Sequence, residues 1–209
     1  MTFKARLYFS PIGYVFHLFL QFYSFLGGRC MVYGFRNNEG KYLPRCRIAS
    51  TAMISNRKNL IIGDNVWINH YTRIDTTGVV DIGEGCQIGY NTCILSHSSH
   101  NAIRLAGLHF MEESIQNRPG YIIKPVHIGK YTFIAGGCYI LPGVTIGKGC
   151  VIGVNSVVTK DIPDYSIAVG SPARVIGSVL ETDKEFLKDK NIQATYFDKS
   201  VVRELYSER

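Results

Sequence analysis

The chain has 209 residues, of which 46% are hydrophobic, and a formal net charge of +7 at pH 7, so we expect one domain with a sizeable core. The basic residues are scattered and form no stripe interleaved with aromatics, which argues against nucleic-acid binding and fits equally well an anionic cofactor or a phosphorylated substrate. The six cysteines include no CxxC spacing, so we expect neither a metal site nor a disulfide framework, and the reducing cytoplasm is the expected location.

The first 45 residues differ in character from the rest and are predicted to form a capping segment. Residues 8–26 (YFSPIGYVFHLFLQFYSFL) are rich in aromatic and aliphatic side chains, but the apolar run is interrupted and too short for a membrane span of roughly 20 residues. No small-residue cleavage site follows a basic start, so a signal peptide is not expected. Two interpretations remain: a helix that caps a solenoid end or lies in a subunit interface, and a helix on the inner membrane surface.

A six-residue repeat dominates the middle of the chain. A helix of period 3.6 cannot keep such a register over twelve cycles, whereas a triangular solenoid with one flat strand and one turn per six residues can. The small position four residues after each aliphatic residue holds Cys86, Cys138 and Cys150, which we expect to pack inside the coil. The repeating aliphatic residues are Ile62, Ile68, Ile74, Ile82, Ile88, Ile94, Ile128, Ile134, Ile140, Ile146, Ile152 and Val158.

Two breaks interrupt the repeat. The step from Ile74 to Ile82 is eight residues, which predicts a bulge of two at one corner. The step from Ile94 to Ile128 is thirty-four residues, and about 101–125 shows no repeat, so we expect an extruded loop there. The loop starts with the sequence SHSSH, which places two of the six histidines where it leaves the rigid wall.

The fold class predicted from these patterns is mainly β. A parallel β-helix domain at 46–177 follows the helical and aromatic N-terminal segment, and the loop projects from its wall. Residues 178–209 are polar and are expected to add a helical extension of one or two short helices outside the solenoid.

The last coils resemble a known family. The stretch from Ile140 to Ile176 contains LPGVTIG, VVTKDIP and GSPARVI in that order, as in hexapeptide-repeat acyltransferases. The most similar subgroup is the maltose, galactoside and nodulation-type sugar O-acetyltransferases with their relatives in polysaccharide biosynthesis, and the similarity covers about 59–177. This resemblance implies a left-handed β-helix, since spacing alone does not determine handedness.

The resemblance also implies an activity. An acetyl-CoA-dependent O-acetyltransferase of this kind acts on a sugar or glycan precursor by direct transfer with a histidine general base, needs no metal, and forms a homotrimer with active sites between subunits. Within the same chemistry, the alternative is N-acetylation of an amino sugar or of a xenobiotic. The alternative of another class is a non-catalytic β-helix scaffold. The aromatic N-terminus suggests an acceptor near the membrane, with peripheral contact at the inner face.

The resemblance assigns roles to several side chains. Aligned in register, the family's catalytic histidine falls on Ser99, one residue before His100, so His100 is the first candidate for the general base and His97 the second. The other four histidines are expected to be structural or to lie at the rim: His17, His70, His109 and His127.

The substrate and cofactor positions follow from the same alignment. Asn69 matches the family's acceptor-binding asparagine, whereas the carboxylate that contacts sugar in galactoside-type enzymes is replaced by Thr77, with Asp75 as the candidate substitute. This departure argues against maltose or galactoside as the acceptor. Cationic and N–H donors suit the three phosphates of the cofactor. The candidate acetyl-CoA contacts are Gly136, Val154, Thr159, Lys160 and Arg174.

Overall fold

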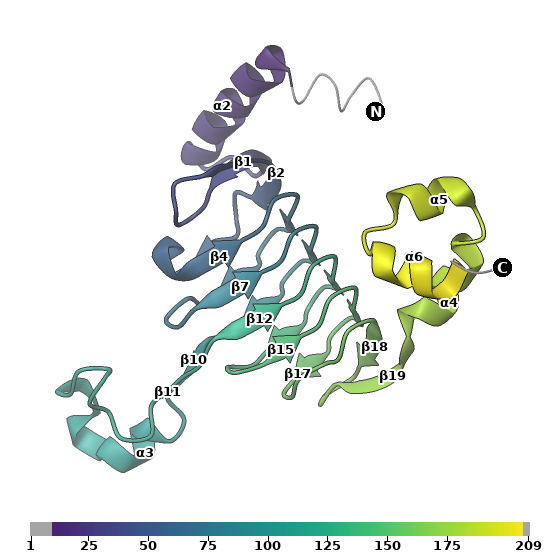
Figure 1. Cartoon of the computed structure of the whole chain (residues 1–209). Helices are drawn as coiled ribbons and strands as arrows, with labels where there is room; N and C mark the ends of the chain where they lie inside the picture. Colours follow the sequence, from purple (N-terminus) through teal and green to yellow (C-terminus); the bar gives the residue numbers. More distant parts are fainter. Residues whose placement is uncertain (1–9, 207–209) are drawn as a thin grey trace.

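The computed structural model describes residues 10–206, which form a parallel β-helix with helices at both ends and one long projecting loop (Figure 1). Residues 8 and 9 of the predicted apolar segment lie outside the described residues. Most strands of the solenoid are two or three residues long and alternate among three sheets, which we call A, B and C. Each of the first four coils contributes one strand to each sheet.

Sheet A has eight strands and includes the hairpins that flank the solenoid. Its first and last strand pairs are antiparallel, and the pairs between them are parallel. In spatial order the strands are β1 (Met31–Arg36), β2 (Tyr42–Ala49), β5 (Trp67–Ile68), β8 (Gln87–Ile88), β13 (Phe133–Ile134), β16 (Val151–Ile152), β18 (Ser166–Val169) and β19 (Arg174–Ser178).

Sheets B and C are entirely parallel. Sheet B has five strands: β3 (Met53–Ile54), β6 (Arg73–Ile74), β9 (Cys93–Ile94), β14 (Tyr139–Ile140) and β17 (Val157–Val158). Sheet C has four strands: β4 (Leu60–Ile62), β7 (Val80–Ile82), β12 (Val126–Ile128) and β15 (Thr145–Ile146).

The repeating aliphatic residues form the core, as predicted. All twelve are buried, with at most 4% of their surface exposed, because the last residue of each short strand points inward and stacks on its counterpart in the next coil. The three cysteines of the small position are also fully buried. Each thiol donates to a backbone carbonyl of the following coil, and burial raises the pKa of Cys86 to about 12, so these thiols are inert packing groups.

The solenoid begins one coil before the regular repeat. Ile48 is in register with Ile68, and Ile54 is in register with Ile74, so β2 and β3 already belong to the first coil. The predicted domain boundary at residue 46 includes this coil, but the repeat was traced only from Ile62, because the eight-residue step from Ile54 to Ile62 breaks the six-residue spacing. A short helical turn, η1 (Arg57–Asn59), fills that longer step.

All the long steps fall at one corner of the triangle, between sheets B and C. This corner, named BC, holds η1 in the first coil, the predicted two-residue bulge in the second, and the extruded loop in the third. These insertions lie above one another because the coils stack in parallel register. Extra residues at one corner do not change which residues of the following strands point inward. The other corners are named AB and CA after the sheets they join.

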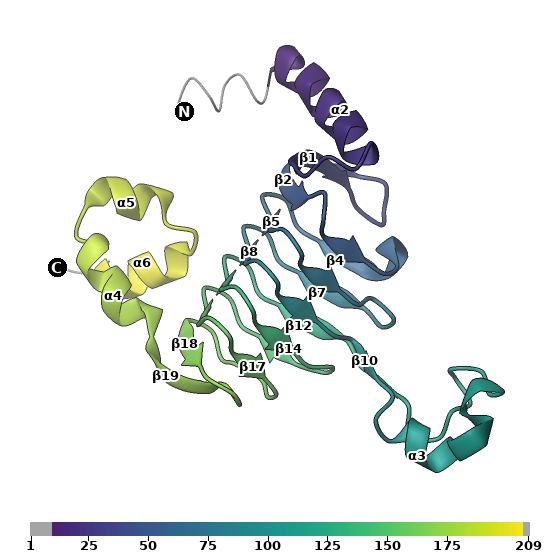
Figure 2. The same cartoon turned by 180° about the vertical axis from the view of Figure 1, so that it is seen from behind.

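The loop has more structure than the sequence suggested. Its two ends pair as an antiparallel ribbon, β10 (His97–Ser98) with β11 (Ile122–Ile123), and its tip contains α3 (Ala102–Ala106) and η2 (Gly107–Met111). Figures 1 and 2 show the ribbon projecting from the solenoid wall with α3 at its far end.

Helices lie at both ends of the chain. Helix α2 (Pro11–Phe25) lies beyond β1 at the N-terminal end of the solenoid (Figure 2). The C-terminal extension contains three helices, where one or two were expected: α4 (Val179–Phe186), α5 (Lys190–Thr195) and α6 (Lys199–Tyr206). The starts of α4 and α5 are determined by local caps. There the Ser178 hydroxyl and the Asp189 carboxylate accept hydrogen bonds from backbone N–H groups. Within residues 10–206, no helix has both the length and the hydropathy needed to cross a membrane.

Candidate active site

A histidine and a carboxylate meet at corner BC. Asp75 directly follows the last residue of β6, and His97 is the first residue of β10, where the loop leaves the next coil. The Nδ1 atom of His97 lies 2.5 Å from Oδ2 of Asp75. The repeat therefore brings together two candidates that the sequence had assigned to different roles.

Hydrogen bonds surround the Asp75 carboxylate. Oδ1 accepts the Thr77 hydroxyl at 2.7 Å, and Oδ2 accepts the backbone N–H of Ser96 at 3.0 Å in addition to the His97 ring. Burial alone would raise the pKa of Asp75, but the hydrogen bonds from Thr77, His97 and Ser96 outweigh it, so the pKa lies below its ordinary value. Asp75 is consequently a buried carboxylate in its ionised form.

This environment determines the tautomer of His97. An ionised carboxylate can only accept hydrogen bonds, so Nδ1 of His97 carries the proton and donates it to Asp75. In the neutral ring the Nε2 lone pair is then available as a base. The ring stacks on Tyr121 with centroids 5.7 Å apart and an angle of 8° between planes, and 33% of its side-chain surface is exposed. The arrangement can accept a proton from a hydroxyl that approaches along corner BC.

His100 lies in a different environment. Its Nδ1 lies 2.7 Å from the hydroxyl of Ser98, and its backbone carbonyl accepts from the Arg104 guanidinium. The residue is exposed, and the structure gives it no contact with a buried carboxylate. The geometry thus favours His97 over His100 as the oriented base, which is the reverse of the order that the alignment favours.

Ser96 and Gly78 complete the corner and were not predicted from sequence. The Ser96 hydroxyl donates to the backbone carbonyl of Asp75 at 2.7 Å and accepts the Gly78 N–H at 2.8 Å. A Cβ atom on Gly78 would lie 3.0 Å from the Ile123 side chain in the loop ribbon, so the bulge packs tightly against β11. The only available sequence signal was the position of Ser96 next to His97. Side-chain contacts across coils leave no spacing pattern of their own.

Asn69 lies at corner AB, away from Asp75. Its amide nitrogen donates to the Ile88 carbonyl at 3.2 Å, while its Oδ1 atom is buried without a hydrogen-bond partner among the described residues. Buried polar atoms are rarely left unpaired, so an unsatisfied amide oxygen needs an explanation such as water or a ligand donor. The two predicted acceptor-binding residues are therefore not brought together within one chain.

The candidate cofactor residues, like Asn69 and Asp75, lie at different corners of the solenoid. Gly136 and Val154 occupy corner AB on successive coils, where the Asn155 N–H donates to the Gly136 carbonyl at 3.0 Å. Thr159 and Lys160 follow the last strand of sheet B, at corner BC. Arg174 is the first residue of β19, exposed to solvent.

Corner CA carries the C-terminal extension. The ring of Phe197 lies 4.7 Å from that of Tyr131 and 6.1 Å from that of Tyr165, both measured between centroids. Asp198 forms an ion pair of 2.7 Å with Lys148 and also accepts the Tyr165 hydroxyl. The three corners thus differ in the groups they hold. Small residues and Asn69 lie at AB, the His97–Asp75 pair lies at BC, and the C-terminal extension packs on CA. Among the described residues, no group of three or more histidine, cysteine, aspartate or glutamate side chains is placed to hold a metal ion.

Residues 125–160 match the model of the bacterial transferase hexapeptide family (six repeats). This stretch carries the hexapeptide repeat of bacterial transferases. It is similar to a Saccharomyces cerevisiae protein provisionally assigned as an acetyltransferase, with 38% identity over 127 residues, 60% of this chain and 59% of the relative. A Staphylococcus aureus (strain COL) protein with the same provisional assignment is 50% identical over 70 residues, 33% of this chain and 35% of the relative. The chain therefore spans between about a third and three fifths of the curated relatives it matches.

Solved structures with the hexapeptide repeat superpose on the solenoid. A Vibrio cholerae hexapeptide-repeat acetyltransferase complexed with acetyl coenzyme A is 29% identical, with a TM-score of 0.53 over 61% of this chain and 64% of its own. A galactoside acetyltransferase in complex with coenzyme A is 33% identical, with a TM-score of 0.54 over 64% of this chain and 62% of its own. The predicted resemblance to hexapeptide-repeat acyltransferases and the left-handed parallel β-helix are confirmed.

Proposed function

We propose that this hexapeptide-repeat protein is an acetyl-CoA-dependent O-acetyltransferase that acts on a hydroxyl group of a sugar or glycan precursor. The observation that carries the proposal is the pairing of His97 with the buried, ionised Asp75 at corner BC, next to the extruded loop. The complexes of two structural neighbours with acetyl coenzyme A and coenzyme A support the choice of acyl donor.

His97 acts as the general base in this proposal. Its Nε2 atom takes the proton of the acceptor hydroxyl, so that the hydroxyl oxygen can bond to the acyl carbon as the bond from carbon to sulfur breaks. The same proton is then delivered to the departing sulfur, which leaves the imidazole neutral for the next cycle. Asp75 stabilises the transient imidazolium and keeps the ring oriented. Such general-base assistance is worth about 100- to 10,000-fold in rate.

The cofactor candidates have the chemistry that a CoA molecule requires. Val154 is 67% exposed, and the N–H of the adjacent Asn155 donates to the Gly136 carbonyl of the previous coil, so these stacked turns present small side chains and backbone groups at the surface. Lys160 and Arg174 are exposed, and neither forms an ion pair with a described carboxylate, which suits phosphate binding at the rim. Acetyl-CoA, when bound there, supplies the activated acyl group.

The division of candidates between corners supports a homotrimer with active sites between subunits. Sheet B separates Gly136 and Val154 from His97 in one chain, so a complete site needs corner AB of one subunit next to corner BC of another. A head-to-tail interface of this kind closes into a ring. The loop tip also exposes apolar side chains, including Leu108 at 96% and Met111 at 80%, which a second copy of the chain can cover.

We place the protein in the cytoplasm, with α2 lying on the inner face of the membrane. Six unpaired cysteines suit a reducing compartment. Helix α2 contains no charged residue and exposes large apolar side chains over most of its length, including Ile12 at 70% and Phe25 at 85%. At 15 residues it is suited to lie in the interface rather than to cross the bilayer.

The first test is release of free thiol from acetyl-CoA in the presence of a panel of sugars, amino sugars, sugar nucleotides and lipid-linked glycans. We expect release that depends on both an acceptor with a hydroxyl group and His97. Release only with amino sugars would replace O-acetylation by N-acetylation. Absence of CoA binding in calorimetry would contradict the enzymatic proposal and support a scaffold.

A further inference from the structure

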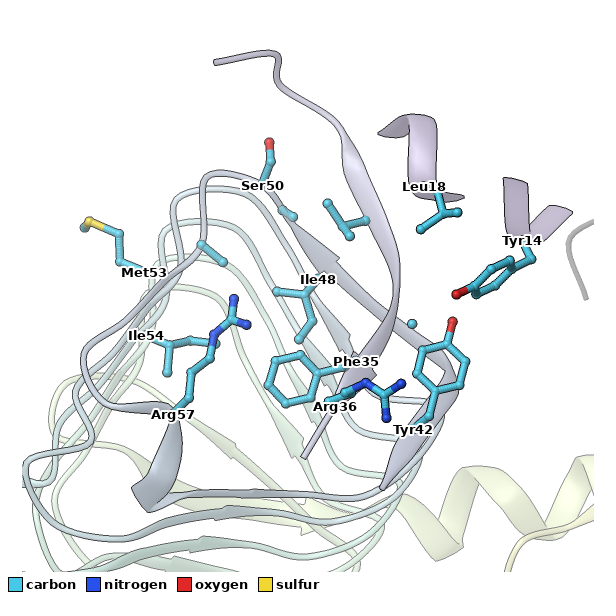
Figure 3. Close-up of a pocket in the computed structure, with 14 residues that line it drawn as sticks. Tyr14, Leu18, Phe35, Arg36, Tyr42, Ile48, Ser50, Met53, Ile54 and Arg57 are labelled. Carbon is cyan, nitrogen blue, oxygen red and sulfur yellow. The ribbon is translucent and has the colours of Figure 1, made fainter. Parts of the chain in front are cut away.

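A large cavity lies at the N-terminal end of the solenoid. Its lining residues all precede Asp75 and His97 in the sequence. Its volume is about 730 Å³, and it lies between α2, the β1–β2 hairpin, β3 and η1 (Figure 3). That volume falls within the range of pockets that enclose a small organic ligand. None of the residues proposed for acetyl transfer lines it.

The lining combines an apolar wall with two cations. Leu18 of α2, Ile48 of β2 and Ile54 of β3 supply aliphatic surface, while Arg36 and Arg57 supply guanidinium groups (Figure 3). Neither arginine forms an ion pair with a carboxylate of the described residues. Tyr14, Tyr42 and Ser50 add hydroxyl groups to the lining, so the cavity combines aliphatic surface with polar and cationic groups that can hold an anionic head.

The two arginines are held by aromatic rings and leave most of their donors available. Arg57 lies over the Phe35 ring at 5.4 Å, and Arg36 lies 5.8 Å from the centre of the Tyr42 ring. Arg36 also donates one hydrogen bond to the Gly40 carbonyl at 3.2 Å. A guanidinium has five N–H donors in a fork that matches phosphate oxygens, so each arginine retains donors for a phosphate.

The charge of the protein is concentrated in the same region. Residues 10–60 contain seven of the 23 basic residues and one of the 16 acidic residues, which gives +6, while residues 61–209 contain 14 basic and 15 acidic residues, which gives −1. The excess charge therefore lies next to the apolar helix and complements an anionic bilayer surface.

The apolar surface of α2 continues from the cavity to solvent. Leu18 lines the cavity, while Phe19 and Phe22 are each 59% exposed on the same helix. A helix seated in the headgroup region with these side chains in the acyl layer would bring the mouth of the cavity to the lipid phosphates.

We propose that this cavity binds one phosphate-bearing membrane lipid per chain, with its phosphate between Arg36 and Arg57 and the start of its chain against Leu18 and Ile48. The proposal rests on the membrane contact of α2 under the proposed function. Coils stack about 4.8 Å apart, so the second and third coils, which carry Asp75 and His97, would lie within about 10 Å of the first coil. That geometry suits an acceptor glycan attached to a membrane lipid.

Two binding measurements test the site separately from the helix. The first is calorimetry with monomeric dihexanoyl phosphatidylglycerol, and the second is co-sedimentation with vesicles of phosphatidylcholine alone or with a third phosphatidylglycerol. We expect one lipid per chain, and preference for the anionic vesicles that salt weakens. The double variant Arg36→Gln, Arg57→Gln should weaken binding of the monomeric lipid and of the anionic vesicles by at least about tenfold each, since one arginine near a bilayer contributes about fivefold in affinity.

Matched variants separate the possible causes. Lys184→Gln with Lys190→Gln removes the same charge from the C-terminal extension and should change binding less than about threefold. The double variant Phe19→Ser, Phe22→Ser should no longer co-sediment with vesicles but should still bind the monomeric lipid. Thermal melts establish that each variant is folded.

The outcomes separate the inference from the proposals on which it rests. Vesicle binding that persists in the double arginine variant, or no binding of monomeric lipid, would overturn the cavity site and leave the membrane contact of α2 intact. No vesicle binding by the wild-type protein would overturn both. Inorganic phosphate that binds as tightly as the monomeric lipid would show that the apolar wall contributes nothing and would also overturn the lipid assignment. Thiol release reports on acetyl transfer independently.

Discussion

Asp75 and His97 lie 22 positions apart in the chain, and their side chains meet at 2.5 Å because they occupy the same corner of successive coils. The two-residue bulge after Asp75 and the start of the loop at His97 are stacked insertions in one parallel ladder. Under the proposed function, this buried carboxylate with its hydrogen-bond acceptors filled orients the partly exposed imidazole for proton transfer.

The first prediction concerns the identity of the base. His97→Ala should lower kcat by at least about 100-fold with CoA affinity intact, because the proton acceptor is lost. Asp75→Asn should lower kcat by at least about tenfold, since the tautomer and the imidazolium are no longer supported. His100→Ala is the matched control and should change kcat less than about threefold. Steady-state thiol release measures all three, and the reverse result for the two histidines would restore the order that the alignment favours.

The second prediction concerns stability at low pH. The pKa of Asp75 is lowered in the folded protein, because hydrogen bonds from Thr77, His97 and Ser96 outweigh its burial. Its ionised form therefore stabilises the fold above the ordinary pKa of about 3.9, and this contribution is lost as the pH falls through the folded value. The difference in Tm between wild type and Asp75→Asn should be constant near neutral pH and shrink below about pH 4. Thermal melts across pH check this, and a difference that grows on acidification would contradict it.

The third prediction tests whether the active site is shared between subunits. Val154→Trp should obstruct the proposed CoA position at corner AB, and because Val154 is exposed the variant should still fold. His97→Ala disables corner BC. Each variant alone should be inactive, but unfolding and refolding an equal mixture should restore up to about a quarter of wild-type activity, since one site in four then combines two intact corners. Mixtures that stay inactive, with mixed trimers confirmed by native mass spectrometry, would mean that each chain holds a complete site.

The fourth prediction concerns the C-terminal extension. The hydrogen bond from Lys148, with others from Ser200 and Tyr165, holds the pKa of Asp198 far below its ordinary value, so Asp198 stays charged and anchors the extension to corner CA. Asp198→Ala should speed proteolytic cleavage within 179–206 at least about fivefold while the solenoid stays resistant. Limited proteolysis with mass spectrometry measures this. Glu204→Ala, an exposed change in the same extension, should cleave at the wild-type rate.

The sequence by itself determined the solenoid and its breaks. Only a strand and turn of six residues can bury an aliphatic residue at every sixth position, so the buried column from Ile62 to Val158 could be listed in advance. The bulge after Ile74 and the loop after Ile94 followed from the same counting. The domain was predicted from residue 46, but Ile54 was not placed in the repeat because the eight-residue step after it hides its register.

Only the tertiary structure decided which candidates meet. Spacing predicts that a residue lies on a wall or a corner, but side-chain contacts across coils depend on rotamers and on the path of the loop, which have no period. Asp75 therefore contacts His97, while Asn69 lies at another corner. The cavity below α2 was equally hidden, because it depends on how a nonrepetitive helix rests on the first coil, and that packing is determined by contacts distant in sequence.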